Sequence, residues 1–130
     1  MSIPLTTKSL EKKDFKIGTI YFNNKYVLTH FNEGVDINYN NFKEVGNFIK
    51  YYFKGKEFGY IANRANSYSI NLNDAKIFNQ SFPNLKAYAI VAHSTYTEKI
   101  FEIENHFFAY NRRAFKNVEE AVNWVESVLV

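Results

Sequence analysis

The chain has 130 residues, which is enough for one domain with a sizeable core. It contains no cysteine, and this excludes disulfides, thiolate metal sites and a cysteine nucleophile. Sixteen basic and 13 acidic side chains give a net charge of +3, and basic residues cluster no further than the pairs Lys12-Lys13 and Arg112-Arg113. We interpret these pairs as solvated surface, so the sequence does not predict nucleic-acid binding.

Residues 1–14 are predicted to form a flexible N-terminal segment. They include Pro4 and several charged side chains but no apolar run, so we do not interpret them as a signal peptide. No stretch of the chain approaches the roughly 20 apolar residues needed to span a bilayer. We therefore expect a cytoplasmic protein without a membrane span, in which residues 15–130 form a single domain.

The first regular element is a predicted β-hairpin. Apolar residues recur between Phe15 and Tyr21, and a second apolar run extends from Tyr26 to Phe31. Residues 23–25, Asn-Asn-Lys, lie between the two runs. Because asparagine tolerates a positive φ better than other residues with a side chain, this spacing favours a tight turn between two antiparallel strands.

Residues 38–54 have the clearest helical pattern in the chain. The apolar side chains that recur at helical spacing are Phe42, Val45, Ile49, Tyr52 and Phe53. Gly55 suits the position that follows a helix. Gly46 costs about 1 kcal/mol relative to alanine inside a helix, so we expect it to lie against the sheet, where close packing offsets that cost.

A buried strand and a polar segment follow, and together they form the candidate functional site. Residues 58–62, Phe-Gly-Tyr-Ile-Ala, carry no charge and predict a central strand buried on both faces. The next positions bring amide, hydroxyl and guanidinium groups together: Asn63, Arg64, Asn66, Ser67, Tyr68 and Ser69. Ligands and partners of open α/β sheets meet the loops at the carboxyl ends of strands, and a helix with Asn71 as its N-cap adds free N–H groups. The alternative interpretation is that these residues only form turns and caps.

The second half of the chain alternates helices and strands. Residues 72–82 predict a short helix, and residues 85–92 predict a second buried strand. A further helix is expected to begin at Thr95, because Thr95 and Glu98 have the spacing of a capping box. The apolar residues expected to face the core from this helix are Ile100, Ile103 and Phe107.

The chain is predicted to end with an edge strand and a helix. Residues 112–115 form the predicted strand, where charged side chains are tolerated and block pairing with a second chain. Residues 117–120, Asn-Val-Glu-Glu, cap the last helix, and its apolar residues follow at helical spacing. Strands that alternate with helices after a hairpin predict a mixed sheet with right-handed crossovers.

Six short stretches of the chain carry a resemblance to a known family. They are residues 18–27 (GTIYFNNKYV), 33–35 (EGV), 58–64 (FGYIANR), 66–70 (NSYSI), 85–91 (LKAYAIV) and 115–124 (FKNVEEAVNW). Spread over residues 16–125, they resemble the small SpoIIAA-like, STAS-type proteins common in flavobacteria and their relatives. The resemblance implies an α/β fold with a mixed sheet of four or five strands, here starting with a hairpin and packed with about four helices.

The resemblance also implies a function in binding. STAS domains act as anti-anti-sigma regulators or as transporter and sensor modules, and the bacterial regulators are switched by phosphorylation of a serine at the start of the helix after a central strand. Ser67 and Ser69 lie near that place and are the candidate phosphorylation sites. The chain departs from the pattern there, because Asn66 replaces the usual aspartate, and again at Asn111 and Arg112, which replace a proline and an apolar residue.

We therefore expect a non-catalytic protein-binding or regulatory domain, with Tyr68 as an anchor for an unidentified protein partner. The alternative is a carrier of a small apolar or lipid-like ligand, because 13 Phe and 10 Tyr could line a pocket between sheet and helix. An enzyme is the weakest interpretation, since His30, His93 and His106 lack metal-ligand spacing and the chain has no nucleophile elbow. No metal or cofactor is expected, and the sequence leaves the oligomeric state open, a homodimer included.

Overall fold

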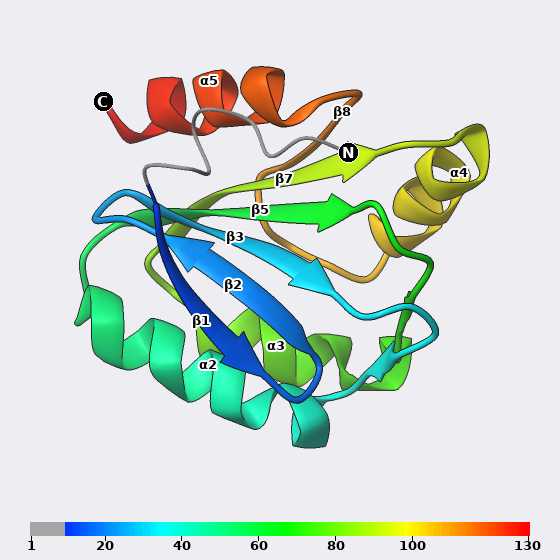
Figure 1. Ribbon diagram of the computed structural model, residues 1–130, viewed down its shortest axis with the longest axis horizontal. Coiled ribbons are helices and arrows are strands. Elements are labelled where there is room, and N and C mark those ends of the chain that lie inside the picture. The colour runs from blue at the N-terminus through cyan, green and yellow to red at the C-terminus, as the bar shows by residue number, and fades with distance from the viewer. Residues whose placement is uncertain (1–9) are drawn as a thin grey trace.

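A six-stranded mixed sheet forms the centre of the computed structural model, which describes residues 10–130 (Figure 1). The strand order is β1-β2-β3-β5-β7-β8. The strands are β1 (Glu11–Phe15), β2 (Gly18–Phe22), β3 (Tyr26–Phe31), β5 (Phe58–Arg64), β7 (Leu85–Ala92) and β8 (Arg112–Phe115). The first three strands pair antiparallel and the remaining pairs are parallel. The predicted α/β fold with an opening hairpin is confirmed, with six strands in place of four or five.

Strand β1 is the strand that the sequence prediction missed. Residues 11–14 belong to the segment that we expected to be flexible, yet they pair with β2, from Glu11 opposite Phe22 to Phe15 opposite Gly18. Their exposed charged side chains do not prevent pairing, because an edge strand bonds on one side only and charge protects its free edge. Residues 1–9 of that predicted segment lie outside the described residues.

Helices cover both faces of the sheet (Figure 1). Helices α2 (Tyr39–Phe53) and α3 (Ala75–Ser81) cover one face, and α5 (Val118–Leu129) covers the other. Helix α4 (Thr95–Glu104) lies beyond the carboxyl ends of β5 and β7. Two short strands, β4 (Asp36–Ile37) and β6 (Ser69–Ile70), pair in parallel beside the main sheet. No helix within residues 10–130 is long and apolar enough to cross a membrane.

Helix α2 forms as the sequence predicts. Asn38 is its N-cap and forms a reciprocal capping box with Asn41, and Lys54 ends the helix in the left-handed conformation. The buried stripe includes Phe42 and Val45. We expected Gly46 to lie against the sheet, but the nearest neighbours of a Cβ at this position would be the rings of Phe42, at 3.3 Å, and Phe82, at 3.6 Å.

The two faces of the sheet have different cores. The face under α2 and α3 is built from large rings, which include Phe22, Phe31, Phe42, Phe53, Phe58, Tyr60, Phe78 and Phe82. The face under α5 is built mainly from smaller side chains, which include Leu28, Ile61, Ala87, Ala89, Val91, Ala121, Val122 and Val125. Gly59 lies under α5, and a Cβ there would collide with Cγ1 of Val125. The absence of a side chain at Gly59 therefore lets the helix approach the sheet closely.

Two helices near the candidate site differ from their predictions. Residues 72–82 form a short 3₁₀ turn (Leu72–Asp74) followed by α3. Helix α4 is capped by Ser94, whose Oγ accepts a hydrogen bond from the Thr97 N–H, so the predicted cap at Thr95 is one residue late. The predicted core stripe of α4 is also wrong.

The inward side of α4 carries Phe101 and Glu104, whereas Ile103 is 52% exposed and Phe107, just beyond the helix, is 46% exposed. The physical reason is that α4 lies at the end of the sheet instead of across a face. Its buried side is therefore narrow, and that side includes a charged residue that is paired.

Candidate functional site

A groove of about 420 Å³ separates the segment after β5 from helix α4. Five of the six predicted site residues line it: Arg64, Asn66, Ser67, Tyr68 and Ser69. The α4 wall contributes Tyr96, Thr97, Ile100, Ile103 and Glu104. The sixth predicted residue, Asn63, is not among the lining residues; it is buried, and its Oδ1 lies 2.8 Å from Nε2 of His93. The volume is in the range of small-ligand pockets in proteins.

Hydrogen bonds to the connection between β3 and β4 hold the segment after β5 in place. The amide of Asn66 donates to the Phe31 carbonyl at 3.0 Å. The Ser69 N–H donates to the Val35 carbonyl at 3.0 Å, and the Gly34 N–H donates to the Ser67 carbonyl at 2.7 Å. These hydrogen bonds give Asn66 and the backbone of both serines a structural role, through contacts between distant segments and not through the local turns and caps of the alternative interpretation.

The two candidate phosphorylation sites both lie next to carboxylates. The Ser69 hydroxyl donates to Asp36 Oδ1 at 2.6 Å, and the Ser67 N–H donates to the Glu33 carboxylate. Neither serine starts a helix, because β6 and then the 3₁₀ turn follow. A phosphate on either hydroxyl would face negative charge. Asn71, the predicted helix N-cap, caps the 3₁₀ turn, and the α-helix α3 begins only at Ala75.

Arg64, which we expected to contact a partner, is buried in the structure and paired within the domain. Its side chain is 4% exposed, and its Nη1 donates to both carboxylate oxygens of Glu104 at 2.9 and 3.1 Å. Its Nη2 donates to the Tyr68 carbonyl at 2.8 Å. Burial by itself lowers the pKa of Arg64, but Tyr68 and Glu104 outweigh burial and raise it. Arg64 thus joins the segment after β5 to α4 beneath the groove.

Arg112 completes this buried ion cluster from the edge strand β8. Its side chain is 4% exposed, so it is not the solvated surface charge that the Arg112-Arg113 pair suggested. Nη1 donates to Asn105 Oδ1 at 2.8 Å, and Nη2 lies 3.4 Å from Glu104 Oε1. The guanidinium carbon lies 4.5 Å from the ring centre of Phe101, 4.8 Å from that of Tyr88 and 5.0 Å from that of Phe108.

Glu104 is the important residue that sequence reasoning did not single out. The signal that could have found it is a second stripe on the same helix, in which Phe101, Glu104 and Phe108 are spaced by three and four residues. The stripe of Ile100, Ile103 and Phe107, which the sequence favours by its apolar character, lies on the more exposed side. A carboxylate between two inward aromatic positions indicates a buried charge that needs a cationic partner.

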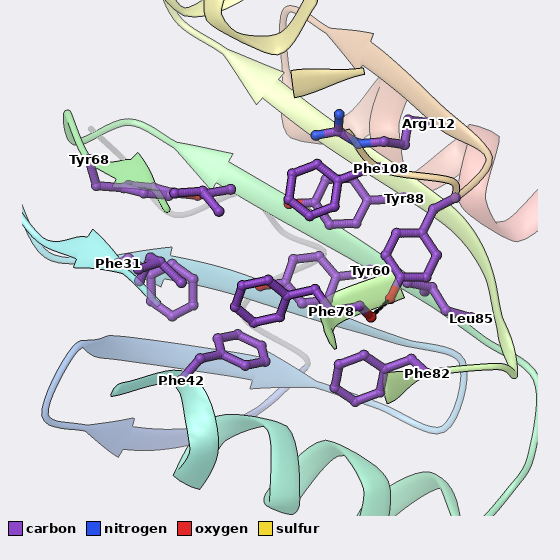
Figure 2. Close-up of a pocket in the computed structure, with 13 residues that line it drawn as sticks. Phe31, Phe42, Tyr60, Tyr68, Phe78, Phe82, Leu85, Tyr88, Phe108 and Arg112 are labelled. Carbon is purple, nitrogen blue, oxygen red and sulfur yellow. Dashed lines mark hydrogen bonds between the residues drawn. The ribbon is translucent and has the colours of Figure 1, made fainter. Parts of the chain in front are cut away.

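A second, smaller space lies inside the aromatic face of the sheet. It is a cavity of about 50 Å³, and Figure 2 shows the rings that surround it. Tyr60 and Tyr88 stack at 4.8 Å between ring centres, and the Tyr68 ring meets Phe31 edge-on at 5.4 Å. Burial raises the pKa of Tyr60 and of Tyr68 above the usual value for tyrosine. The cavity has room for a few water-sized groups, far below the volume that a lipid-like ligand needs.

The histidines do not form a cluster. Among residues 10–130, no three His, Asp or Glu side chains are arranged to hold a metal ion. His93 is exposed at the carboxyl end of β7, where it contacts Asn63. The site that the described residues offer is therefore the groove with its buried ion cluster beneath, next to the aromatic cavity.

Comparison with known proteins identifies the fold. No model of a known protein family matches the chain, and no curated protein matches it. The chain is similar in structure to an uncharacterized protein from the DUF3478 family with a SpoIIAA-like fold, from Shewanella loihica PV-4. The TM-score is 0.56 at 10% sequence identity, over 90% of this chain and 92% of the other. The fold of this chain is thus SpoIIAA-like, as the sequence resemblance implied.

Proposed function

We propose that this domain is a non-catalytic protein-binding module with a regulatory role, and that its partner places an apolar side chain in the groove between the segment after β5 and α4. The observation that carries the proposal is the exposure of large apolar side chains along this groove. Tyr96 is 69% exposed and Ile103 is 52% exposed, and both line the groove. Exposed apolar residues gathered in one concave place are typical of interaction sites.

Both walls of the groove contribute apolar surface. Ile70 and Leu72 line it from the side of β6 and the 3₁₀ turn, opposite Ile100 of α4. Polar residues of the segment after β5, Asn66 and Ser67, lie along the same wall. An apolar centre with polar groups at the edge is the usual composition of a protein interface. Such an arrangement suits a short protein segment with one apolar anchor.

The buried ion pair beneath the groove supports a preformed site. Arg64 and Glu104 join the two walls by two hydrogen bonds, and both side chains are almost fully buried. Walls that are already fixed lose little conformational freedom on binding, so more of the contact energy contributes to affinity. The SpoIIAA-like fold agrees with this proposal, because domains of the STAS type generally function by binding other proteins.

Introduction of a charge into the groove provides the test. We expect Ile103→Asp to abolish capture of the partner, because a carboxylate in an apolar contact loses its hydration without gaining a pair. The matched control is Tyr51→Asp on α2, since Tyr51 is also a large exposed residue, at 73%. Mass spectrometry identifies the proteins that are captured by the wild type and by the control but not by Ile103→Asp. Each such partner is then purified, and its affinity for the wild type and for both variants is measured. Equal affinity for all three forms would contradict the proposal.

Alanine variants of the buried residues beneath the groove would not test this site. Replacement of Arg64 or Tyr68 by alanine would remove buried contacts, so a loss of binding would not separate a contact role from unfolding. Ile103 and Tyr96 avoid this problem because they are largely exposed.

A further inference from the structure

The buried ion cluster under the groove contains more positive than negative charge. Two guanidinium groups, those of Arg64 and Arg112, share the single carboxylate of Glu104. Among residues 10–130, neither arginine is within ion-pair distance of a second acidic side chain. Arg64 forms the shorter hydrogen bonds to Glu104, at 2.9 and 3.1 Å, whereas the hydrogen bond from Arg112 to Glu104 measures 3.4 Å. Arg112 is therefore the less compensated of the two cations.

Arg112 also retains an unused hydrogen-bond donor. Its Nε is buried and has no hydrogen-bond partner. The side chain lines the aromatic cavity, and Figure 2 shows its guanidinium over the rings of Phe108 and Tyr88. Those rings compensate part of the charge through their π faces, but they leave Nε without an acceptor. A buried donor without a partner is rare in folded proteins and calls for an acceptor.

We propose that the aromatic cavity is a binding site for a small monocarboxylate, whose carboxylate pairs with Arg112 and whose short apolar part lies among Tyr60, Tyr88 and Phe78. A carboxylate is complementary to the planar guanidinium in geometry and in charge, and it neutralises the excess positive charge of the ion cluster. The cavity of about 50 Å³ limits the apolar part to a few heavy atoms. The rest of the lining consists of aromatic side chains and of Ile37, Ile70 and Leu85, which disfavours a more strongly hydrated dianion such as phosphate.

Phe108 is the residue that controls access to the cation. It is half-buried, it lies between α4 and β8 outside any helix or strand, and its ring lies 5.0 Å from the guanidinium carbon of Arg112. The carboxylate reaches Nε when this ring moves aside. Tyr68 and Ile70 line both this cavity and the groove, but neither Arg112 nor Phe108 lines the groove, so the two proposals can be tested separately.

The probes are propionate and butyrate, each compared with its neutral amide at constant ionic strength and followed by calorimetry and by thermal unfolding. We expect the acids to bind and to raise the melting temperature, and the amides to do neither. Arg112→Met should weaken butyrate binding by about 10- to 100-fold, the range for one charged hydrogen bond. Arg113→Met is the matched control, because Arg113 is exposed on the same strand, and it should change nothing.

Phe108→Ala keeps the test decisive if Arg112→Met fails to fold. This variant uncovers the guanidinium and should bind butyrate more tightly than the wild type does. Equal responses to acid and amide would overturn the proposal, as would unchanged or weaker butyrate binding in Phe108→Ala. Tighter binding of inorganic phosphate than of butyrate would overturn the choice of a monocarboxylate.

Discussion

The two faces of the sheet are covered by helices that pack in different ways. Under α5 the core is built largely from alanine, valine and other aliphatic side chains, and Gly59 allows direct contact between its strand and Val125. Under α2 and α3 the core is built from rings that meet mostly edge to face, and they leave a cavity of about 50 Å³. Small side chains fill space at close range, whereas large rigid rings leave gaps between them.

This difference suggests a division of roles between the faces. The α5 face is closely packed where Gly59 meets Val125, so we assign it to stability. The aromatic face holds the cavity, and Tyr68 and Ile70 line both that cavity and the groove beside α4. The ion cluster of Arg64, Glu104 and Arg112 lies at the same end of the molecule. Binding functions are therefore expected on the aromatic side and beyond the carboxyl ends of its strands.

The largest expected effect comes from the ion cluster. Glu104→Ala leaves two buried guanidinium groups without a carboxylate, and breaking a buried pair in this way costs about 3–5 kcal/mol. The free energy of unfolding in urea should fall by that amount. Glu102→Ala, an exposed change on the same helix, should shift it by no more than about 0.5 kcal/mol. Equal effects would show that the cluster does not stabilise this end of the fold.

A smaller effect is expected from crowding of the aliphatic face. Gly59→Ala places a methyl group against Cγ1 of Val125, and overpacking of this kind costs about 1–3 kcal/mol. Val125→Ala should relieve the clash, so the double variant should be more stable than the sum of the two single changes predicts. If the changes in the free energy of unfolding caused by the two substitutions were additive, this would contradict the close packing that we assign to this face.

The aromatic face should respond to alkaline pH. Burial raises the pKa of Tyr60 and Tyr68 above the usual value of 10.0, so above pH 10 the unfolded chain loses protons that the folded chain keeps. The contribution of these tyrosines to the free energy of unfolding should be constant below pH 10. Above pH 10 it should fall, by up to about 1.4 kcal/mol per pH unit for each tyrosine.

Phenylalanine variants provide the controls for this pH dependence. Tyr60→Phe and Tyr68→Phe should each flatten the fall in stability above pH 10, because each removes one buried titrating hydroxyl. Tyr51→Phe, at a position that is 73% exposed, should leave the slope unchanged. A slope that is the same in all variants would mean that the buried tyrosines do not cause it.

The smallest effect on stability is expected in the groove. Ile103→Ser removes an exposed side chain, so the free energy of unfolding should change by no more than about 0.5 kcal/mol. If Ile103→Ser destabilises the domain by 2 kcal/mol or more, then Ile103 belongs to the core and is not part of an exposed interaction surface. Urea unfolding of the wild type and the variant distinguishes the two.

Local sequence patterns predicted most of the fold. The stripe of α2, the uncharged run of β5 and the asparagine turn between β2 and β3 depend on neighbours within a few residues, so the sequence alone identifies them. Strand β1 was missed because its residues are charged and exposed, and its pairing with β2 is what makes it a strand.

The candidate site was predicted in location but not in detail. Five of its six predicted residues line the groove, because polar residues after a buried strand lie at the carboxyl edge of the sheet. The contribution of α4 to the groove could not be predicted, because it depends on contacts between residues far apart in the sequence. Glu104, for example, pairs with Arg64 from 40 positions away. The burial of Arg112 depends on three rings from other elements and has no local sequence signal.

Site-specific photo-crosslinking tests the proposed groove most directly. A benzophenone amino acid is placed at position 103 in the groove or at position 51 on α2, in the cells that make the protein. We predict a discrete crosslinked partner from position 103, its loss when Tyr96→Asp is added, and no such product from position 51. The same products from both positions, or a product at position 103 that survives Tyr96→Asp, would contradict a binding site in the groove.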